Sequence, residues 1–204
     1  MSAQSPTEEL LDDIRNLEDD IEGLENQYRN LNHSIPLYLQ KLAKGMRKHE
    51  RTLIDKKNRK TVIGYRKGII EVLEIVKELY RNNNYHIMLR QVQDLTCSIQ
   101  KHENFSSDLQ KLLEHFSAKE IDKFINTNRA KLLDIGREEG YNVEIPRLIL
   151  NKSETMRNTA EKLGEKGKKS EAEGLLIIGA LLLKALENLY EDKCGQYILK
   201  ELAA

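Results

Sequence analysis

Arg81, Asn82 and His86 form the pattern R-N-x-x-x-H near the middle of the chain. An arginine holds anionic groups through its guanidinium, and a histidine transfers protons near neutral pH, so the pair has the side chains that acid-base chemistry on a phosphate would need. The polar stretch 81–84 also predicts a turn between two helices. In that structural alternative, Arg81 lies beside the last carbonyls of a helix ending at Tyr80, and His86 lies at the surface of the next helix.

The R-N-x-x-x-H pattern resembles the signature of HEPN-domain ribonucleases. The resemblance implies that Arg81 and His86 would steady a scissile phosphate and move protons during RNA cleavage. Motifs for other chemistry are missing, since the sequence has no HExxH, no EF-hand loop and no clustered histidine and cysteine set. The segment LGEKGKKS lacks the first glycine and the preceding strand of a phosphate loop, which predicts a turn between helices. We expect no metal and no cofactor.

A coiled-coil seam is the clearest element that the sequence predicts. Its apolar residues alternate in steps of four and three. They are Leu10, Ile14, Leu17, Ile21, Leu24, Tyr28 and Leu31, followed by Ile35. With isoleucines at position a and leucines at position d, the pattern favours two-stranded pairing, so we predict that these residues bind a partner helix. An ordinary amphipathic helix is the alternative.

The charges around this seam argue against a parallel homodimer, because Asp13, Glu18, Asp20 and Glu25 flank it and would face like charges. Residues 8–25 contain nine acids and one base, whereas residues 41–60 contain nine bases and two acids. Two arrangements satisfy this complementarity. One is an antiparallel hairpin within the chain, and the other is a basic helix from a partner protein.

The predicted fold is all-α, with an N-terminal coiled-coil helix or helical hairpin followed by a multi-helix bundle. Residues 1–60 form the arm, with an acidic helix at 8–34 and a basic helix at 36–58, because Pro36 removes a backbone donor between them. Residues 61–204 form the bundle. The apolar residues of 62–80 cover more than one face, which places that helix inside the bundle.

Local signals divide the bundle into further helices. Thr61 is a candidate cap, and the spacing of Gly64 and Gly68 indicates close approach of another helix. Helical spacing continues through Ile87, Leu89, Val92, Leu95 and Ile99. Ser117 with Glu120 and Ser170 with Glu173 each form a predicted capping box. The helix that begins after Ser117 is predicted to end near Gly136 or Gly140, and Pro146 stands at the start of a later helix.

Composition limits the classes of partner. Charged residues make up 32% of the 204 residues, aromatic residues 5%, and the formal net charge is zero, so no overall basic field attracts nucleic acid, and we expect no nucleic-acid partner. The two cysteines, Cys97 and Cys194, lie far apart, which argues against a disulfide framework and favours a reducing, cytosolic compartment. We also expect no signal peptide and no membrane span.

From residue 79 onward the order of elements is similar to the helical region of CATCHR-family vesicle-tethering subunits, especially those of the Golgi-associated retrograde and endosomal recycling complexes. The resemblance is carried by LYRNNNYHIMLRQVQDL, by QKHENFSSDLQKLLEHFSAKEIDKFI and by the tail GLLIIGALLLKALENLYEDKCGQYILKEL. It implies a subunit of a larger complex that acts in vesicle tethering and protein transport, in the cytoplasm and peripherally on Golgi or endosomal membranes.

We therefore expect a non-enzymatic interaction subunit, an adaptor or tether-like protein that pairs through its N-terminal coiled coil. A HEPN-type ribonuclease or toxin that uses Arg81 and His86 is one alternative. A structural homo-oligomer is another.

Overall fold

The computed structural model describes residues 5–95, 97–100 and 105–203. All regular elements in these ranges are α-helices, which confirms the predicted all-α multi-helix bundle. The helices are α1 (Pro6–Gln27), α2 (Ser34–Lys48), α3 (Glu50–Lys56), α4 (Arg59–Arg81), α5 (Asn83–Gln91), α6 (Phe105–His115), α7 (Ala118–Glu138), α8 (Glu144–Glu165), α9 (Lys169–Glu191) and α10 (Lys193–Glu201).

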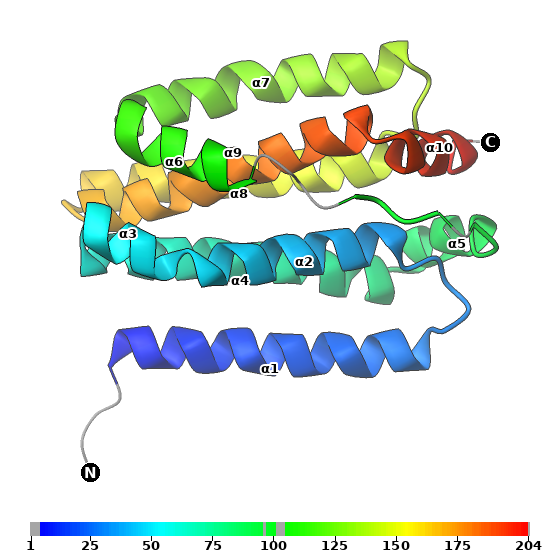
Figure 1. Cartoon of the computed structure of the whole chain (residues 1–204), viewed down its shortest axis with the longest axis horizontal. Helices are drawn as coiled ribbons and strands as arrows, with labels where there is room; N and C mark the ends of the chain where they lie inside the picture. Colours follow the sequence, from blue (N-terminus) through cyan, green and yellow to red (C-terminus); the bar gives the residue numbers. More distant parts are fainter. Residues whose placement is uncertain (1–4, 96, 101–104, 204) are drawn as a thin grey trace.

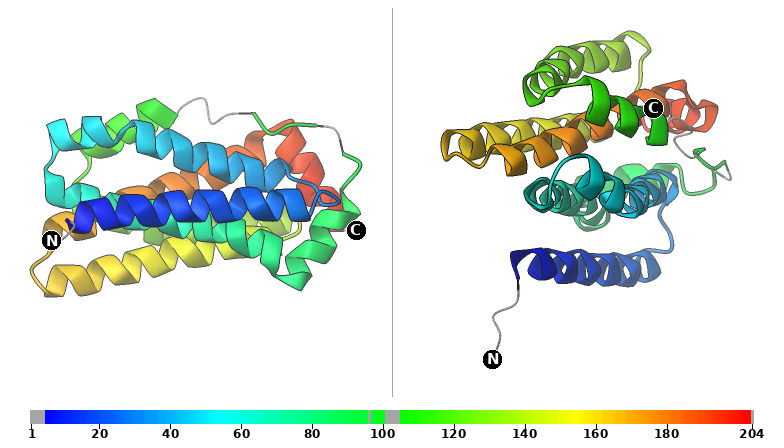
Figure 2. Two further views of the ribbon diagram at one scale, coloured as in Figure 1. Left: turned by 90° about the horizontal axis from the view of Figure 1, so that it is seen from below. Right: turned by 60° about the vertical axis from the view of Figure 1, so that its left-hand side comes forward.

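The long helices run side by side in layers (Figure 1). The helix α1 forms one outer layer and packs on α4, and α2 covers another side of α4. Next come α8 and α9, and α7 lies on the far side of them, as the two further views also show (Figure 2). The helix α4 lies at the centre because it contacts α1, α2, α8 and α9.

The helices α4 and α9 approach each other so closely that their backbones touch. A Cβ built on Gly64 would lie 1.8 Å from the backbone oxygen of Glu171, and one built on Gly174 would lie 2.1 Å from the backbone oxygen of Thr61. Only glycine leaves room for such a contact. The close approach predicted from Gly64 and Gly68 is therefore confirmed, and Gly174 supplies the matching glycine on α9.

The predicted acidic helix at 8–34 ends earlier, at Gln27. Its last turn closes through the amide of Tyr28, which donates to Leu24 O at 2.9 Å, and the following residues include asparagines, which favour turns over helix interiors. Pro36 lies in the first turn of α2, where a proline is tolerated. The predicted basic helix at 36–58 is divided by His49 into α2 and α3.

Two caps differ from those predicted, and one is confirmed. Ser117 and Glu120 form the predicted capping box at the start of α7. At the start of α4 the cap is Asn58 rather than Thr61, because the Asn58 side chain accepts from the amides of Lys60 and Thr61. No capping box forms at Ser170, which lies inside α9. Its hydroxyl instead accepts a hydrogen bond from the Asn58 side chain at 3.2 Å.

The helix predicted to continue through Ile99 ends at Gln91. In a continuing helix, each carbonyl would accept from the amide four residues later. Here Asn32 occupies two of them: its backbone amide donates to Leu89 O at 3.1 Å and its side-chain amide donates to Val92 O at 2.8 Å. Asn32 is 3% exposed, so the turn after α1 is anchored in the core and closes the end of α5.

The predicted boundary at residue 60 is not a boundary between cores. Buried residues of α1 and α2 belong to the same hydrophobic cluster as those of α4 and α9. Polar contacts cross the same place, since Arg66 on α4 pairs with Glu50 on α3 at 2.7 Å and also donates to Thr7 O on α1. The segment expected to form a separate arm is one side of the bundle.

The two cysteines are joined, contrary to the expectation from their wide spacing. Cys97 and Cys194 form a disulfide with their Cα atoms 5.7 Å apart, and it ties the segment after α5 to α10. Ninety-seven positions separate them in the sequence, so no local spacing announces the pair. The cysteine content therefore no longer supports a reducing compartment.

Candidate partner-binding surface

The apolar seam of α1 lies against the chain's own core. Buried seam residues are Ile14, Leu17, Ile21, Leu24 and Leu31, while Leu10 and Tyr28 are half-buried. The helix α1 packs on α4. The apolar residues of α4 cover more than one of its faces, so α4 can bury the seam of α1 as well as contact the rest of the core. We correct the prediction of a separate partner helix for the buried seam residues of α1, because within this structure α1 packs on α4. Tyr28 packs instead against His86 of α5.

The acidic residues beside the seam remain at the surface. Two of them form ion pairs with neighbouring helices: Glu18 with Arg47 on α2 at 2.6 Å, and Asp20 with Lys77 on α4 at 2.9 Å. The hydrogen bond from Lys77, helped by its charge, lowers the pKa of Asp20 below its ordinary value. These contacts fix α1 on the bundle but use only part of its negative charge.

Several charges of α1 and α2 take part in none of the described ion pairs. On α1 they are Glu9, Asp13, Asp19, Glu22 and Glu25, and on α2 they are Lys41, Lys44 and Lys48. The predicted hairpin complementarity is therefore realised across these two helices mainly by Glu18 and Arg47. Most of the charge of this surface stays available to another molecule.

A groove of about 490 Å³ separates α1 from α2. It is lined by Glu18, Asp19, Ile21, Glu22, Glu25, Leu37, Gln40, Lys44 and Leu73. Its α1 wall is acidic, while Ile21 and Leu73 are almost fully buried beneath it. Glu18 Oε1 and Gln40 Nε2 are buried atoms without a hydrogen-bond partner in the structure. Buried polar atoms usually have hydrogen-bond partners. A protein segment bound in the groove could supply partners for these two atoms and for the unpaired charges beside them.

The three residues of the candidate catalytic pattern lie at a break between helices. Arg81 ends α4 and is exposed, with its guanidinium 3.8 Å from Asp20. Asn82 caps α5 by accepting from the amide of Asn84. His86 packs edge-on against Tyr28, with ring centroids 4.4 Å apart. The predicted turn is confirmed, although Arg81 contacts a carboxylate of α1 rather than the last carbonyls of its own helix.

Arg81 lies near Asp20 of α1, whereas His86 packs against Tyr28, which follows the end of α1. Their neighbours Asp20 and Tyr28 are eight positions apart, which corresponds to about 12 Å along a helix. Burial, together with the positive charge of Arg90, lowers the pKa of His86 and so favours its neutral form. Each of the two side chains therefore has a structural neighbour at this break between helices.

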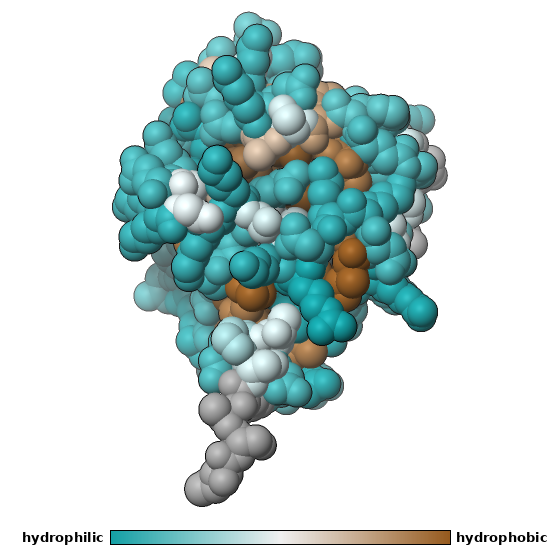
Figure 3. Space-filling view, turned by 90° about the vertical axis from the view of Figure 1, so that its left-hand side faces the viewer, coloured by the Kyte–Doolittle hydropathy of each residue, from teal (hydrophilic) through white to brown (hydrophobic). Residues whose placement is uncertain are grey.

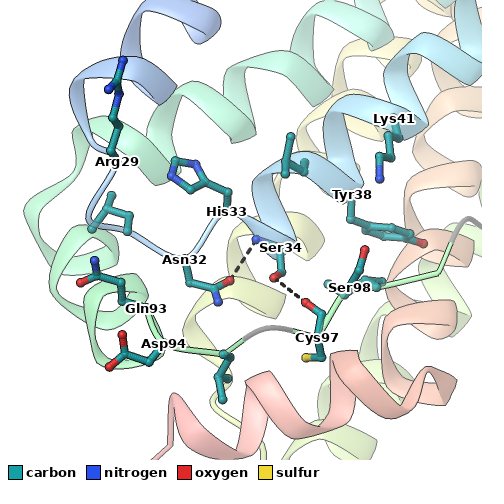
Figure 4. A pocket seen from close by; sticks show the side chains of 14 residues that line it. Arg29, Asn32, His33, Ser34, Tyr38, Lys41, Gln93, Asp94, Cys97 and Ser98 are labelled. Carbon is teal, nitrogen blue, oxygen red and sulfur yellow. Dashed lines mark hydrogen bonds between the residues drawn. The ribbon is translucent and has the colours of Figure 1, made fainter.

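A second, polar cavity of about 430 Å³ lies where the α1–α2 turn meets the segment after α5 (Figure 4). Its inner polar groups bind one another: Ser34 N donates to Asn32 Oδ1 at 2.9 Å, and Ser34 Oγ donates to Cys97 O at 3.4 Å. Tyr38 donates to Ala185 O at 3.0 Å. Arg29 points away from this group in Figure 4. These hydrogen bonds of Asn32, Ser34 and Tyr38 join separate segments of the chain around the cavity.

Apolar surface is dispersed on the end of the molecule that carries α3 and the α8–α9 turn. Figure 3 shows brown patches in separate recesses between hydrophilic side chains, with no continuous apolar face. The large apolar side chains exposed in the described residues, Ile54, Ile87, Phe116 and Tyr197, come from different helices. A site defined by charge, between α1 and α2, is therefore better supported than an apolar one.

Searches of the described residues for two other kinds of site give negative results. No group of three or more histidine, cysteine, aspartate or glutamate side chains is arranged to hold a metal ion. No helix in the described ranges is long and apolar enough to cross a bilayer.

Comparisons of the chain with protein-family models, with curated proteins and with solved structures find no match. The resemblance to tethering subunits therefore stays a prediction.

The groove itself was not predicted from the sequence. Its acidic wall follows from the charges around the seam, but the opposite wall depends on α2 lying beside α1, which the sequence left open as one of two arrangements. The signal available was the run of bases that follows Pro36, and in particular the spacing of Lys41, Lys44 and Lys48, which places them on one side of a helix.

Proposed function

We propose that this protein is a non-catalytic interaction subunit, an adaptor or tether-like component, that assembles through the outer surface of α1 and α2. The observation that carries the proposal is the groove between these helices, which has the acids Asp19, Glu22 and Glu25, outside the described ion pairs, on its α1 wall and Lys44 on its α2 wall. Charges arranged in this way give a complementary protein surface orientation and speed of association more than affinity.

The packing of the α1 seam against α4, within the chain, also supports the role of an interaction subunit. Because α4 covers its apolar side, α1 is held in place without a partner protein. Assembly therefore does not require α1 to fold on binding. A pre-formed surface loses less entropy when it binds than a segment that must first become ordered. The resemblance to vesicle-tethering subunits favours a place in such a complex at Golgi or endosomal membranes.

Isolation of the tagged protein from its native cell tests the proposal. We expect partner chains to be retained at about 0.05 M salt and released at about 0.5 M, since the Debye length falls from roughly 14 to 4 Å. The double variant Glu22→Lys, Glu25→Lys should lose them at low salt as well. A matched control, Glu9→Lys with Asp13→Lys, makes the same change of charge on the opposite flank of α1 and should keep them.

Two results would contradict the proposal. One is an identical set of retained chains for the wild type and the groove variant. The other is saturable cleavage of single-stranded RNA by the purified wild type that His86→Ala abolishes without unfolding the protein. That second result would assign the protein to the ribonuclease alternative.

A further inference from the structure

Two ridges of opposite charge run along the groove between α1 and α2. On α1, Glu18, Glu22 and Glu25 follow one another at steps of four and three, so they share the side of the helix that faces α2. On α2, Lys44 lines the groove, and Lys41 and Lys48 lie three and four positions away beside it, so the three exposed lysines follow one another along the helix. The two helices run antiparallel (Figure 2), so the acidic ridge and the basic ridge extend side by side along the groove.

The two ridges pair with each other very little inside one molecule. The described ion pair between α1 and α2 joins Glu18 to Arg47, and the three lysines of the basic ridge take part in none. Each molecule thus presents an acidic strip and the complementary basic strip on the same surface. Such a surface fits a copy of itself if a symmetry operation exchanges the two strips.

One orientation of a two-fold axis does so. A two-fold axis running along the groove places the acidic ridge of each molecule opposite the basic ridge of the other, at both sides of the axis. An axis across the groove would place acid against acid and base against base, which is repulsive. Closed two-fold dimers with the same patch on both subunits are the commonest soluble assemblies.

We propose that the partner of this surface is a second copy of the chain, and that α1 and α2 of two molecules pack as a two-fold dimer with its axis along the groove. The proposal rests on the proposed function and names the partner at that same surface. Leu37, half-buried beside the lysines, adds apolar contact between the ridges. The dimer is distinct from a parallel pairing of the α1 seam, because the seam stays buried on α4.

The surface is small and polar, so we expect a weak dimer with a dissociation constant on the order of 10 µM at low salt. Sedimentation velocity of the full chain at concentrations above and below this value measures it. Raising the salt to about 0.5 M should weaken the association at least about tenfold, because screening removes the attraction between the ridges. A chain that stays monomeric throughout the concentration range at low salt would overturn the inference.

Charge reversal gives a sharper test. Glu22→Lys with Glu25→Lys makes both strips basic, and Lys44→Glu with Lys48→Glu makes both strips acidic, so each variant alone should be monomeric. An equimolar mixture should form the mixed dimer, because each strip again faces its opposite. Monomers in the mixture, with native helical content by circular dichroism, would contradict the two-fold arrangement, as would dimers of either variant alone.

The control Glu9→Lys with Asp13→Lys should dimerise like the wild type. Failure of the dimer and failure of the proposed function give different results. A monomeric protein that still retains other chains in a groove-dependent manner would disprove the second copy as partner and leave the interaction subunit standing.

Discussion

Gly64 on α4 and Gly174 on α9 face each other across a backbone contact, since a Cβ added to Gly174 would lie 3.0 Å from the carbonyl carbon of Gly64. Each of the two central helices contributes a glycine to this crossing. The helix α4 packs on α9 with one side and on α1 and α2 with its other sides. The position of the groove therefore depends on a contact on the opposite side of α4.

Replacing Gly64 with alanine should destabilise the fold, because its Cβ would overlap the backbone oxygen of Glu171 at 1.8 Å. We expect the free energy of unfolding to fall by about 1–3 kcal/mol or more, as for other overpacked sites. Gly23→Ala on α1 is the control, since a Cβ there meets nothing within 4 Å, and it should raise stability by roughly 0.5–1 kcal/mol. Urea unfolding of both variants measures the difference. Equal stabilities would show that α4 and α9 are less close than described.

Ile21→Asp should weaken the whole fold rather than only an interaction. Ile21 is 2% exposed beneath the groove, and an unpaired charge placed there has no compensating partner. We expect a loss on the order of 3–5 kcal/mol, comparable to a broken buried ion pair. Asn16→Asp adds the same charge at an exposed position of α1 and should change stability little. Thermal unfolding tests both, and a native-like melting temperature for Ile21→Asp would restore α1 as a separate arm.

His86 should make the protein less stable as the pH falls. Burial and the charge of Arg90 lower its pKa in the folded state, so the unfolded chain binds the proton more readily. The stability it contributes is therefore present above its unfolded pKa of about 6.5 and is lost as the pH falls through the lower, folded pKa. Comparing denaturant unfolding of the wild type and of His86→Gln between about pH 8 and about pH 5 isolates the contribution of His86. A pH dependence that is identical in both proteins would show that His86 is solvated in the folded state.

Breaking the disulfide should lower stability without changing the helices. Cys97 and Cys194 close a loop of 97 positions, and removing a bond across such a loop costs about 2–5 kcal/mol. Cys97→Ser and Cys194→Ser should have equal effects, and the double variant should add little. Guanidinium unfolding under non-reducing conditions measures the loss. Unequal effects of the two single variants would indicate that one cysteine acts without the other.

Several local signals predict the structure correctly, although the caps predicted at Thr61 and at Ser170 from equally local signals were wrong. The Ser117 and Glu120 capping box, the turn at Asn82 and the glycine spacing of Gly64 and Gly68 were all predicted from neighbouring residues. Each depends on hydrogen bonds or steric limits within a few positions, so the chain carries the information in one place.

What the sequence left open depends on distant contacts. The seam of α1 is satisfied equally by a partner helix or by α4, because both bury the same apolar stripe. The end of α5 is set by Asn32 from the turn after α1, and the disulfide joins positions 97 apart. The groove shares this limitation, since it exists only when α1 and α2 lie on adjacent sides of α4.

The hydrogen bonds from Asn32 to the end of α5 make the length of this helix depend on the docking of the α1–α2 turn. The stop signal for α5 lies about sixty positions upstream and acts only after the α1–α2 turn has docked, since it consists of the two hydrogen bonds to Leu89 O and Val92 O. Before docking, the apolar spacing of 85–95 favours continuation of the helix past Gln91. The end of α5 is therefore set by a tertiary contact, and α5 has its native length only when the α1–α2 turn is docked.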